Sequence, residues 1–473
     1  MVALRDVDVP VLPLDRFRPL VGEERYADLQ ATARLTREAV RGRTVWTLNS
    51  TAAGGGVAEM LRVLVGYGLG TGLHVRWQAI SGDEPFYAIT KRIHNRIHGS
   101  PGDEGGLGPA EANHYRSVSE ENATAFLGEA RPGDVAILHD PQTAGMSRPL
   151  AEAGVHVVWR CHIGADLSNR WTEEAWRFLL PELRAAQAFV FSRQAYVPAE
   201  LSTARVSVIP PSIDPFSPKN YDMSSEAVAA VLQAIGVLGG PPDVPATFAR
   251  FDGTQGTVAR RATIIGEDHG LDPSQPLVVQ VSRWDRLKDM AGVMAGFAEG
   301  VAERSDAHLV LVGPAVDGVA DDPEGAEVLA ECASAWHRLR RQQRRAISLV
   351  TLPMDDVDEN AAMVNALQRQ ATVIVQKSLF EGFGLTVSEG MWKAKPVVAS
   401  AVGGIVDQIA AGTGVLLDDP TDLEQFADVL VDLLRRPEDA IGIGDRARRH
   451  VIHHFLGDRH LLQLARLIGE LLD

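Results

Sequence analysis

Short apolar runs alternate with stretches of helical spacing along most of the chain. An apolar run bounded by turn residues is typical of a strand buried in a parallel sheet, and an amphipathic stretch between two such runs is typical of a crossover helix. The pattern therefore predicts an α/β protein with two series of strands. The first series comprises residues 44–49, 73–80, 135–138, 155–160, 188–191 and 206–209, and the second comprises residues 277–282, 309–312, 347–352, 372–376 and 396–400.

Between the two series the chain changes in character. Residues 210–276 contain two Pro-Pro pairs and the run Gly239-Gly240-Pro241-Pro242, with few strand signals, which indicates a linker that contains some helix. Two doubly wound domains are therefore expected, and their strand ends would face a central cleft where ligands bind. The predicted division is an N-terminal extension packing on the first domain (1–40), a first domain (41–212), a linker or insert (213–272), a second domain (273–450) and a C-terminal helix that crosses back to the first domain (451–473).

Length and composition agree with this division. A chain of 473 residues is too long for one ordinary core, and an apolar fraction of 45% is that of a globular protein. The two cysteines, Cys161 and Cys332, lie far apart, which suits a reducing cytosol and excludes a cysteine-based zinc site. No apolar run reaches membrane-spanning length, and residues 1–19 lack the continuous apolar core of a signal peptide. We therefore expect a cytoplasmic protein.

The charge balance restricts the partners. The chain has 46 basic and 62 acidic residues, a net charge of −16, and no long basic run. Nucleic acid and anionic membrane surfaces are therefore not expected as partners, although a local phosphate pocket is compatible with this balance. Small-molecule substrates are the expected partners, and a homodimer is compatible with the sequence.

Candidate binding groups follow several predicted strands of the first domain. Gly54, Gly55 and Gly56 open a helix after the first strand, but they match neither a P-loop nor a dinucleotide fingerprint. They predict close approach of the backbone to a phosphate or sugar; the alternative is a tight turn. Asp140 and His162 each follow a strand and are expected in the cleft, whereas the alternative for His162 is a structural histidine.

Charged residues follow two predicted strands of the second domain. Arg283 and Lys288 could together balance a diphosphate, although an exposed mixed-charge turn is the alternative. Glu381 and Glu389 flank a glycine-containing loop that opens a helix, and both could accept hydrogen bonds from hydroxyls of one ligand. The alternative is that Glu381 caps the helix and Glu389 is a solvated surface charge.

With these residues in place, the second half resembles the retaining glycosyltransferases of the GT-B class, family 4, which have two Rossmann-like domains and include sucrose and glycogen synthases. The match rests on Arg283 with Lys288 and Glu381 with Glu389. A narrower resemblance is to the trehalose glycosyltransferring synthases, which join a nucleotide-activated glucose to free glucose. That resemblance is carried by residues 49–61, 159–163, 280–289, 360–368 and 382–393.

The resemblance implies a role for each matching residue. Arg283 and Lys288 would hold the leaving diphosphate and Glu389 the ribose. Asp140 would bind sugar hydroxyls, and His162 would lie beside the donor sugar. The donor sugar and nucleotide would be bound by Glu381 together with Gly382, Phe383, Gly384, Leu385 and Thr386, and by Gly54, Gly55 and Gly56.

The reaction implied is transfer of α-glucose from ADP-, UDP- or GDP-glucose to glucose, giving α,α-trehalose by a front-face mechanism in which the diphosphate acts as base. No cofactor or bound metal is required by that scheme; a loosely held Mg²⁺ is compatible with the sequence but is not implied by it. The nearest alternative is a phosphate-dependent trehalose phosphorylase. A glycosyltransferase with another sugar or cyclitol acceptor, a nucleotide-sugar isomerase and a catalytically silent sugar-binding protein are further alternatives.

Overall fold

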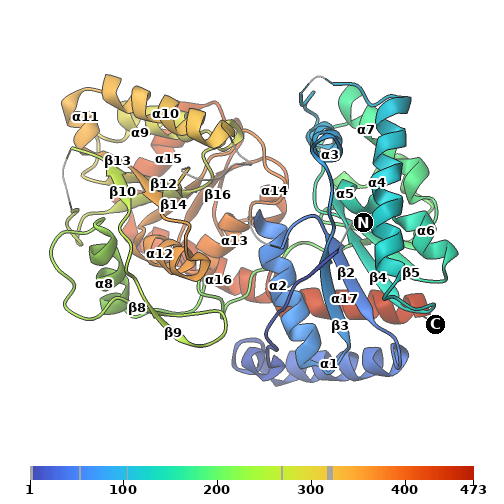
Figure 1. The fold of residues 1–473 in the computed structure, drawn as a ribbon. Coiled ribbons are helices and arrows are strands. Elements are labelled where there is room, and N and C mark those ends of the chain that lie inside the picture. The colour runs from blue at the N-terminus through green and yellow to red at the C-terminus, as the bar shows by residue number, and fades with distance from the viewer. Residues whose placement is uncertain (1–3, 53–54, 104, 268–269, 317–322, 473) are drawn as a thin grey trace. The chain divides into compact units, whose positions relative to one another are not determined.

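The structure is a computed structural model that describes residues 4–52, 55–103, 105–267, 270–316 and 323–472 (Figure 1). It divides into two compact units. Unit 1 consists of Met1–Ser212 and Phe455–Asp473, and unit 2 consists of Ile213–His454. Each unit is built around a seven-stranded sheet with helices on its faces, so the predicted fold class, two Rossmann-like α/β units, is confirmed.

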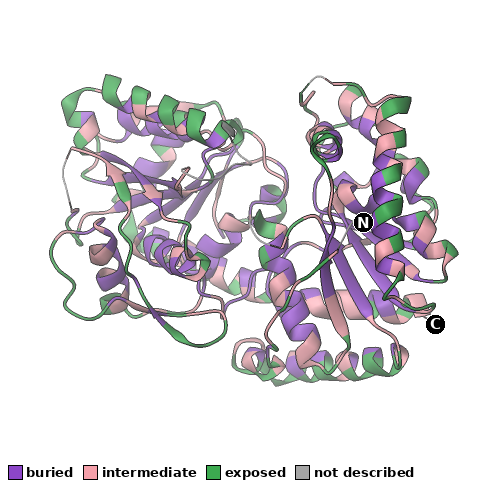
Figure 2. Cartoon of the chain, in the orientation of Figure 1, coloured by how far each residue is buried: buried purple, intermediate pink, exposed green. Residues whose placement is uncertain are grey.

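Unit 1 contains a sheet of strand order β1-β3-β2-β4-β5-β6-β7. All neighbours pair in parallel except β1 and β3, which are antiparallel. The central strands β2 and β4 are mainly apolar and every residue in them is buried, as Figure 2 shows. The strands are β1 (Arg5–Asp6), β2 (Val45–Asn49), β3 (Val75–Ala79), β4 (Val135–His139), β5 (His156–Cys161), β6 (Ala188–Phe191) and β7 (Val206–Val208).

Successive side chains of these strands point to opposite faces of the sheet. On one face, Trp159 of β5 packs with side chains from α3 (Glu84–Ile97), α4 (Pro109–Leu127) and α7 (Arg170–Leu183). On the other face, Val45, Val135 and Val158 pack with side chains of the C-terminal helix α17 (Gly457–Leu472). The first-unit core therefore includes residues from the end of the chain.

The C-terminal helix α17 is fixed to unit 1 by polar contacts as well. Arg25, on α1 (Arg18–Ala39), forms an ion pair with Asp458 at 2.5 Å, and Thr36 of α1 donates a hydrogen bond to the carbonyl of Ala465 at 3.3 Å. The preceding helix, α16 (Pro437–His454), belongs to unit 2. The prediction of a C-terminal helix that crosses back to the first domain is thus confirmed.

Unit 2 contains a sheet of order β10-β13-β12-β11-β14-β15-β16, parallel except for β10 against β13. Its strands are β10 (Thr263–Ile265), β11 (Leu277–Val281), β12 (His308–Pro314), β13 (Ile347–Leu352), β14 (Val373–Gln376), β15 (Val397–Ser400) and β16 (Val415–Leu417). Its remaining helices include α9 (Met290–Gly300), α10 (Pro323–Arg338), α12 (Val357–Gln370), α13 (Leu385–Trp392) and α15 (Leu423–Arg435).

Residues 213–272, expected as a linker or insert, are grouped with unit 2. They contain helix α8 (Ser225–Ile235), which ends at the left-handed Gly236, and a two-stranded hairpin of β8 (Thr247–Ala249) and β9 (Gln255–Thr257). Strand β10 joins the edge of the main sheet. No helix in the described part of the chain is both long and apolar enough to cross a membrane.

Candidate active site

In unit 2, Lys288 and Glu381 meet although 93 positions separate them in the sequence. Lys288 ends a short 3₁₀ turn after β11, and Glu381 lies in the loop after β14. The two loops are joined by the hydrogen bond from Leu379 N to Leu287 O, at 2.8 Å. Lys288 Nζ lies 2.6 Å from Glu381 Oε2, and the two side chains are only 16% and 11% exposed. A cation and a carboxylate are therefore fixed together at the carboxyl ends of two adjacent strands.

A second ion pair supports the same two loops. Lys377, which directly follows β14 and is fully buried, pairs with Asp289. Asp289 adopts the left-handed conformation, with φ of 49°, and its carboxylate accepts a hydrogen bond from the amide of Gly292 at the start of α9. The sequence reasoning did not select Lys377 or Asp289. Their positions in the sequence could have indicated them, because Asp289 directly follows Lys288 and Lys377 lies four positions before Glu381.

Arg283 lies in the same loop as Lys288 but is much more accessible. Its guanidinium pairs with Asp285 Oδ2 at 3.0 Å, and its side chain is 60% exposed. Asp285 also accepts a hydrogen bond from the amide of Leu287, which fixes the turn that leads to Lys288. Arg283 therefore has the exposure that direct contact with a ligand requires.

The loop between Glu381 and α13 requires glycine at position 384, because of its backbone conformation and the space around it. Gly384 has φ of 82° and caps α13, and a Cβ atom there would lie 3.0 Å from Cγ of Glu381. The side-chain amide of Gln408 donates hydrogen bonds to the carbonyls of Gly384, at 3.2 Å, and Phe383. The N-cap of α13 is thus Gly384 and not Glu381, so the alternative in which Glu381 caps this helix is wrong.

Other residues of this loop are engaged in supporting it. The carbonyl of Gly382 accepts a hydrogen bond from Gly404 N at 3.1 Å. The Thr386 hydroxyl donates to Gln376 Oε1, at the end of β14, at 2.8 Å. Leu385 is the first residue of α13. These contacts hold the loop in one shape, and contact between these residues and a ligand stays a prediction.

Glu389 lies on α13 and is only 5% exposed. Its carboxylate accepts a hydrogen bond from Gln368 Nε2 at 3.4 Å and lies 3.6 Å from Lys219 Nζ. The alternative in which Glu389 is a solvated surface charge is therefore wrong. Lys219 and Gln368 were not selected from the sequence, because they come from the segment before α8 and from α12, and nothing in their local sequence indicates this contact.

A buried lysine completes the surroundings of Glu389. Lys393 Nζ donates hydrogen bonds to Asn220 Oδ1 at 2.9 Å and to the backbone carbonyl of Glu389 at 3.3 Å. Burial lowers the pKa of Lys393 well below its usual value, and the nearby carboxylate of Glu389 partly opposes that shift. The environment of Glu389 is thus polar, enclosed and rich in donors.

In unit 1, Asp140 and His162 are brought into contact by adjacent strands. Asp140 follows β4 with φ of 64°, and its Oδ1 accepts a hydrogen bond from the backbone amide of His162 at 2.8 Å. Burial raises the pKa of Asp140 to about 7, against the hydrogen bond from His162 and the charge of Arg160, which both lower it. Asp140 can therefore exchange a proton near neutral pH.

His162 is part of a buried polar row. Its Nε2 lies 2.9 Å from Nδ1 of His139, the two rings are stacked, and His139 Nε2 lies 2.7 Å from the hydroxyl of Thr47. Beside this row Arg160 is buried, and its guanidinium donates hydrogen bonds to His460 Nε2 and to the carbonyl of Ile209. Burial lowers the pKa of Arg160 to about 9.

The glycine triplet is described only in part. Gly54 lies outside the described residues, whereas Gly55 and Gly56 are exposed at the start of α2 (Gly55–Gly70). Gly55 has φ of 81°, which favours glycine for conformational reasons, and a Cβ there would meet no atom within 4 Å. The backbone at Gly55 is therefore open to approach, and contact with a phosphate or sugar stays a prediction.

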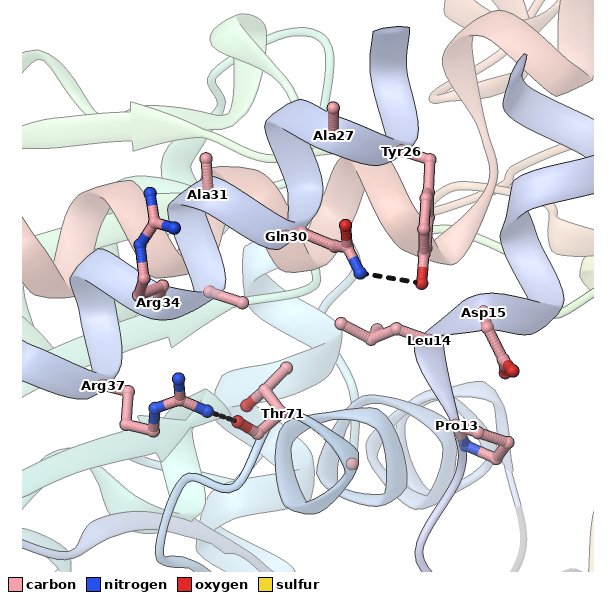
Figure 3. Close-up of a pocket in the computed structure, with 12 residues that line it drawn as sticks. Pro13, Leu14, Asp15, Tyr26, Ala27, Gln30, Ala31, Arg34, Arg37 and Thr71 are labelled. Atoms are coloured by element: carbon pink, nitrogen blue, oxygen red, sulfur yellow. Dashed lines mark hydrogen bonds between the residues drawn. The ribbon is translucent and has the colours of Figure 1, made fainter. Parts of the chain in front are cut away.

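An open groove of about 700 Å³ lies in unit 1 between α1, residues 13–15 and the end of α2. Figure 3 shows the residues that line it. Within it, Gln30 donates a hydrogen bond to the hydroxyl of Tyr26 at 3.0 Å, and Arg37 donates to the carbonyl of Thr71 at 2.9 Å. None of the residues that were selected from the sequence lines this groove. This groove is therefore separate from the site that the sequence motifs predict.

Comparison with known proteins shows the family of the chain. Residues 47–198 match the family model described as trehalose synthase, N-terminal domain, and residues 263–450 match glycosyl transferases group 1. The chain is 33% identical over 459 residues to a trehalose synthase of Rubrobacter xylanophilus, covering 96% of each chain. It is 25% identical over 463 residues to a trehalose phosphorylase of Pleurotus pulmonarius, covering 93% of this chain but 58% of that protein.

The fold also matches solved structures. An α,α-trehalose-phosphate synthase from Burkholderia xenovorans, in complex with glucose-6-phosphate, superposes with a TM-score of 0.65 at 15% identity, covering 91% of this chain and all of the other. The two units and the matched transferase model thus define a glycosyltransferase of the GT-B fold, which acts on small-molecule sugars. Within that class, the chain belongs to the trehalose synthase family.

Proposed function

We propose that this chain transfers an α-glucosyl group from a nucleoside-diphosphate glucose to free glucose and so forms α,α-trehalose. The observation that carries the proposal is the contact between Lys288 and Glu381. It puts a cation that can bind a departing diphosphate beside a carboxylate that can accept hydrogen bonds from sugar hydroxyls. ADP-, UDP- and GDP-glucose are the donors to be compared.

The surroundings of Glu389 support a nucleotide donor. Its carboxylate is buried and held by Gln368 and Lys219, so its oxygens have a fixed direction. A fixed carboxylate can accept two hydrogen bonds from the adjacent hydroxyls of a ribose. Arg283, which is exposed in the loop of Lys288, would add a second positive charge on the diphosphate.

The stereochemistry favours a front-face reaction. Both linkages of α,α-trehalose are α, so an α-linked donor must react with retention. Retention by double displacement needs a carboxylate nucleophile, and we assign Glu381 to the donor hydroxyls instead. In the proposed step the bond from C1 to the diphosphate oxygen breaks as the bond from C1 to the acceptor oxygen forms. The acceptor proton passes to the departing diphosphate, while Arg283 and Lys288 stabilise the negative charge.

The proposed step uses protein side chains as its positive charges, so we expect turnover without an added divalent metal. Assays in the presence of EDTA test this point. Loss of turnover in EDTA that Mg²⁺ restores would mean that a metal shares the diphosphate with Arg283 and Lys288.

The rival function is phosphate-dependent cleavage of trehalose. The phosphorylase relative supports it, but the match is at lower identity and covers only 58% of that protein, against 96% of the trehalose synthase. A phosphorylase has no ribose to bind, so an essential role of Glu389 in nucleotide binding would favour the synthase.

The experiment is to incubate the purified protein with ADP-, UDP- and GDP-glucose, each with and without glucose, and to measure nucleoside diphosphate and disaccharide by chromatography. We expect trehalose to appear only with glucose and in equal amount to the released diphosphate. Trehalose cleavage that requires phosphate and no nucleotide would establish the rival function instead. Diphosphate release with another sugar or a cyclitol, but not with glucose, would change the acceptor.

A further inference from the structure

A row of polar side chains crosses the carboxyl ends of three neighbouring strands in unit 1. Thr47 belongs to β2, His139 ends β4, and His162 directly follows β5. Val45, Val135 and Val158 lie on the sheet face that α17 covers. Side chains an even number of positions apart on a strand lie on the same face, so Thr47, His139 and His162 lie on that face too. The three residues are buried and joined in series by two hydrogen bonds.

The direction of the first hydrogen bond follows from the bonding needs of the Thr47 hydroxyl. Its oxygen lies 2.7 Å from His139 Nε2, and among the described residues the hydroxyl has no other hydrogen-bond partner. If His139 Nε2 carried a proton, the Thr47 proton would be buried without an acceptor, which is costly. Thr47 therefore donates, and His139 Nε2 accepts.

The proton positions on the two rings then follow in order. Burial and the neighbouring charge of Arg160 lower the pKa of both His139 and His162 well below the usual value, so both rings are neutral. A neutral His139 that accepts at Nε2 carries its proton on Nδ1 and donates it to His162 Nε2, 2.9 Å away. His162 must then carry its own proton on Nδ1.

The Nδ1 atom of His162 is the free end of this series, because it has no hydrogen-bond partner among the described residues. We propose that His162 presents an Nδ1–H donor to an oxygen of the bound sugar, and that Thr47 and His139 are positioning residues that fix this tautomer. The role at the sugar rests on the proposed function, whereas the tautomer itself does not. Neither Thr47 nor His139 was selected from the sequence.

Arg160 and His460 provide an internal reference. Arginine has only donors, so His460 Nε2 must accept from Arg160, at 2.6 Å, and the proton of His460 lies on Nδ1, facing the hydroxyl of Ser212 at 2.9 Å. This ring has the same tautomer as His162 but does not depend on Thr47. Replacing Thr47 should therefore alter the His139 and His162 signals and leave the His460 signal unchanged.

The first test is NMR on the full chain labelled with ¹⁵N in the histidine rings, with signals assigned by His139→Gln, His162→Gln and His460→Gln. We expect the Nδ1–H tautomer for all three rings, and a mixed or Nε2–H pattern for His162 in Thr47→Val. An Nε2–H tautomer of His162 in the wild-type protein would overturn the proposal, whether or not the protein forms trehalose.

The second test is kinetic, with the substrates of the proposed reaction. We expect Thr47→Val to lower kcat by about ten-fold with little change in KM, since one positioning hydrogen bond is lost, and Thr47→Ser to restore most of the rate. The matched control is Ser348→Ala, which removes an equally buried hydroxyl from His308 Nε2 in unit 2, at 2.9 Å. It should leave kcat within about two-fold of wild type.

The outcomes separate the two proposals. If the wild-type protein forms no disaccharide from any donor, the proposed function fails and the NMR measurement still decides the tautomer. If the wild type is active and Thr47→Val retains its kcat, the positioning role is refuted. If Thr47→Ser is as slow as Thr47→Val, or Ser348→Ala is equally slow, the effect reflects packing and the positioning role is also refuted.

Discussion

Replacing Lys288 with methionine removes the positive charge at the Glu381 contact and keeps most of the side-chain length. Under the proposed mechanism, Lys288 stabilises the negative charge that develops on the departing diphosphate. Loss of one such electrostatic contact lowers turnover by on the order of 10²-fold, equivalent to about 2.7 kcal/mol of transition-state stabilisation. We therefore expect Lys288→Met to lower kcat by about that factor.

The same change has a structural cost that can be estimated separately. A hydrogen bond between charged groups contributes about 1.5–3 kcal/mol, and we take the lower end because both side chains keep some exposure, 16% for Lys288 and 11% for Glu381. For a unit of this size, a loss of about 1.5 kcal/mol lowers the melting temperature by roughly 3–6 °C. The hydroxyl of Ser378 still contacts Glu381 at 3.3 Å and limits the loss.

The double variant Lys288→Met with Glu381→Gln separates stability from catalysis. It removes the carboxylate charge together with the ammonium charge that neutralises it, so the melting temperature should return to within about 2 °C of wild type, while kcat stays low. Melting is followed by calorimetry and turnover by release of nucleoside diphosphate. Turnover of Lys288→Met within ten-fold of wild type would refute the leaving-group role. A double variant as unstable as Lys288→Met would show that the lost stability does not come from the carboxylate charge that Lys288 neutralises.

Three further predictions address the other site residues. Arg283→Ala should lower kcat by about 10²-fold without a change in melting temperature, because its side chain is 60% exposed; normal kcat would exclude a contact with the diphosphate. Glu389→Gln should weaken nucleotide binding by about ten-fold in calorimetric titration, and unchanged affinity would count against a ribose contact. Burial raises the pKa of Asp140 from its ordinary value of 3.8 to about 7. Between these two pH values the carboxyl group of Asp140 keeps its proton in the folded protein and has lost it in the unfolded chain. Stability should therefore fall as pH rises through this window, by on the order of 1 kcal/mol per pH unit, and less steeply in Asp140→Asn; equal slopes in denaturant titrations would contradict the shift.

The sequence predicted the longer strands well and missed most of the shortest ones. Strands such as β4 and β11 are mainly apolar because both of their faces are buried, so a short apolar run in the sequence identifies them. The strands that were missed are β1, β8, β9, β10 and β16, which have two or three residues each. A run that short carries no usable period, and its pairing is decided by tertiary contacts.

Some contacts of the candidate site could be predicted from the sequence and others could not. Lys288 and Glu381 could be predicted to lie near each other because each follows a central strand of one parallel sheet, and the structure joins them. Lys219 and Gln368 reach Glu389 from a segment and a helix far away in the sequence. His460 reaches Arg160 across 300 positions. Such contacts depend on how helices pack on the sheet, and local spacing does not determine this.

The Lys288–Glu381 contact also indicates how one pair of side chains could serve two parts of a donor. In the structure each charge is the partner of the other, at 2.6 Å, so neither is buried without compensation. Under the proposed function, a nucleotide sugar brings a diphosphate, which can replace Glu381 as the partner of Lys288, and sugar hydroxyls, which can replace Lys288 as the partner of Glu381. A free nucleoside diphosphate supplies only the first of these replacements, so Glu381 loses its contact with Lys288 and gains no sugar hydroxyl in exchange. The pair would therefore favour the intact donor over the diphosphate product, and Glu381→Gln should reduce that preference.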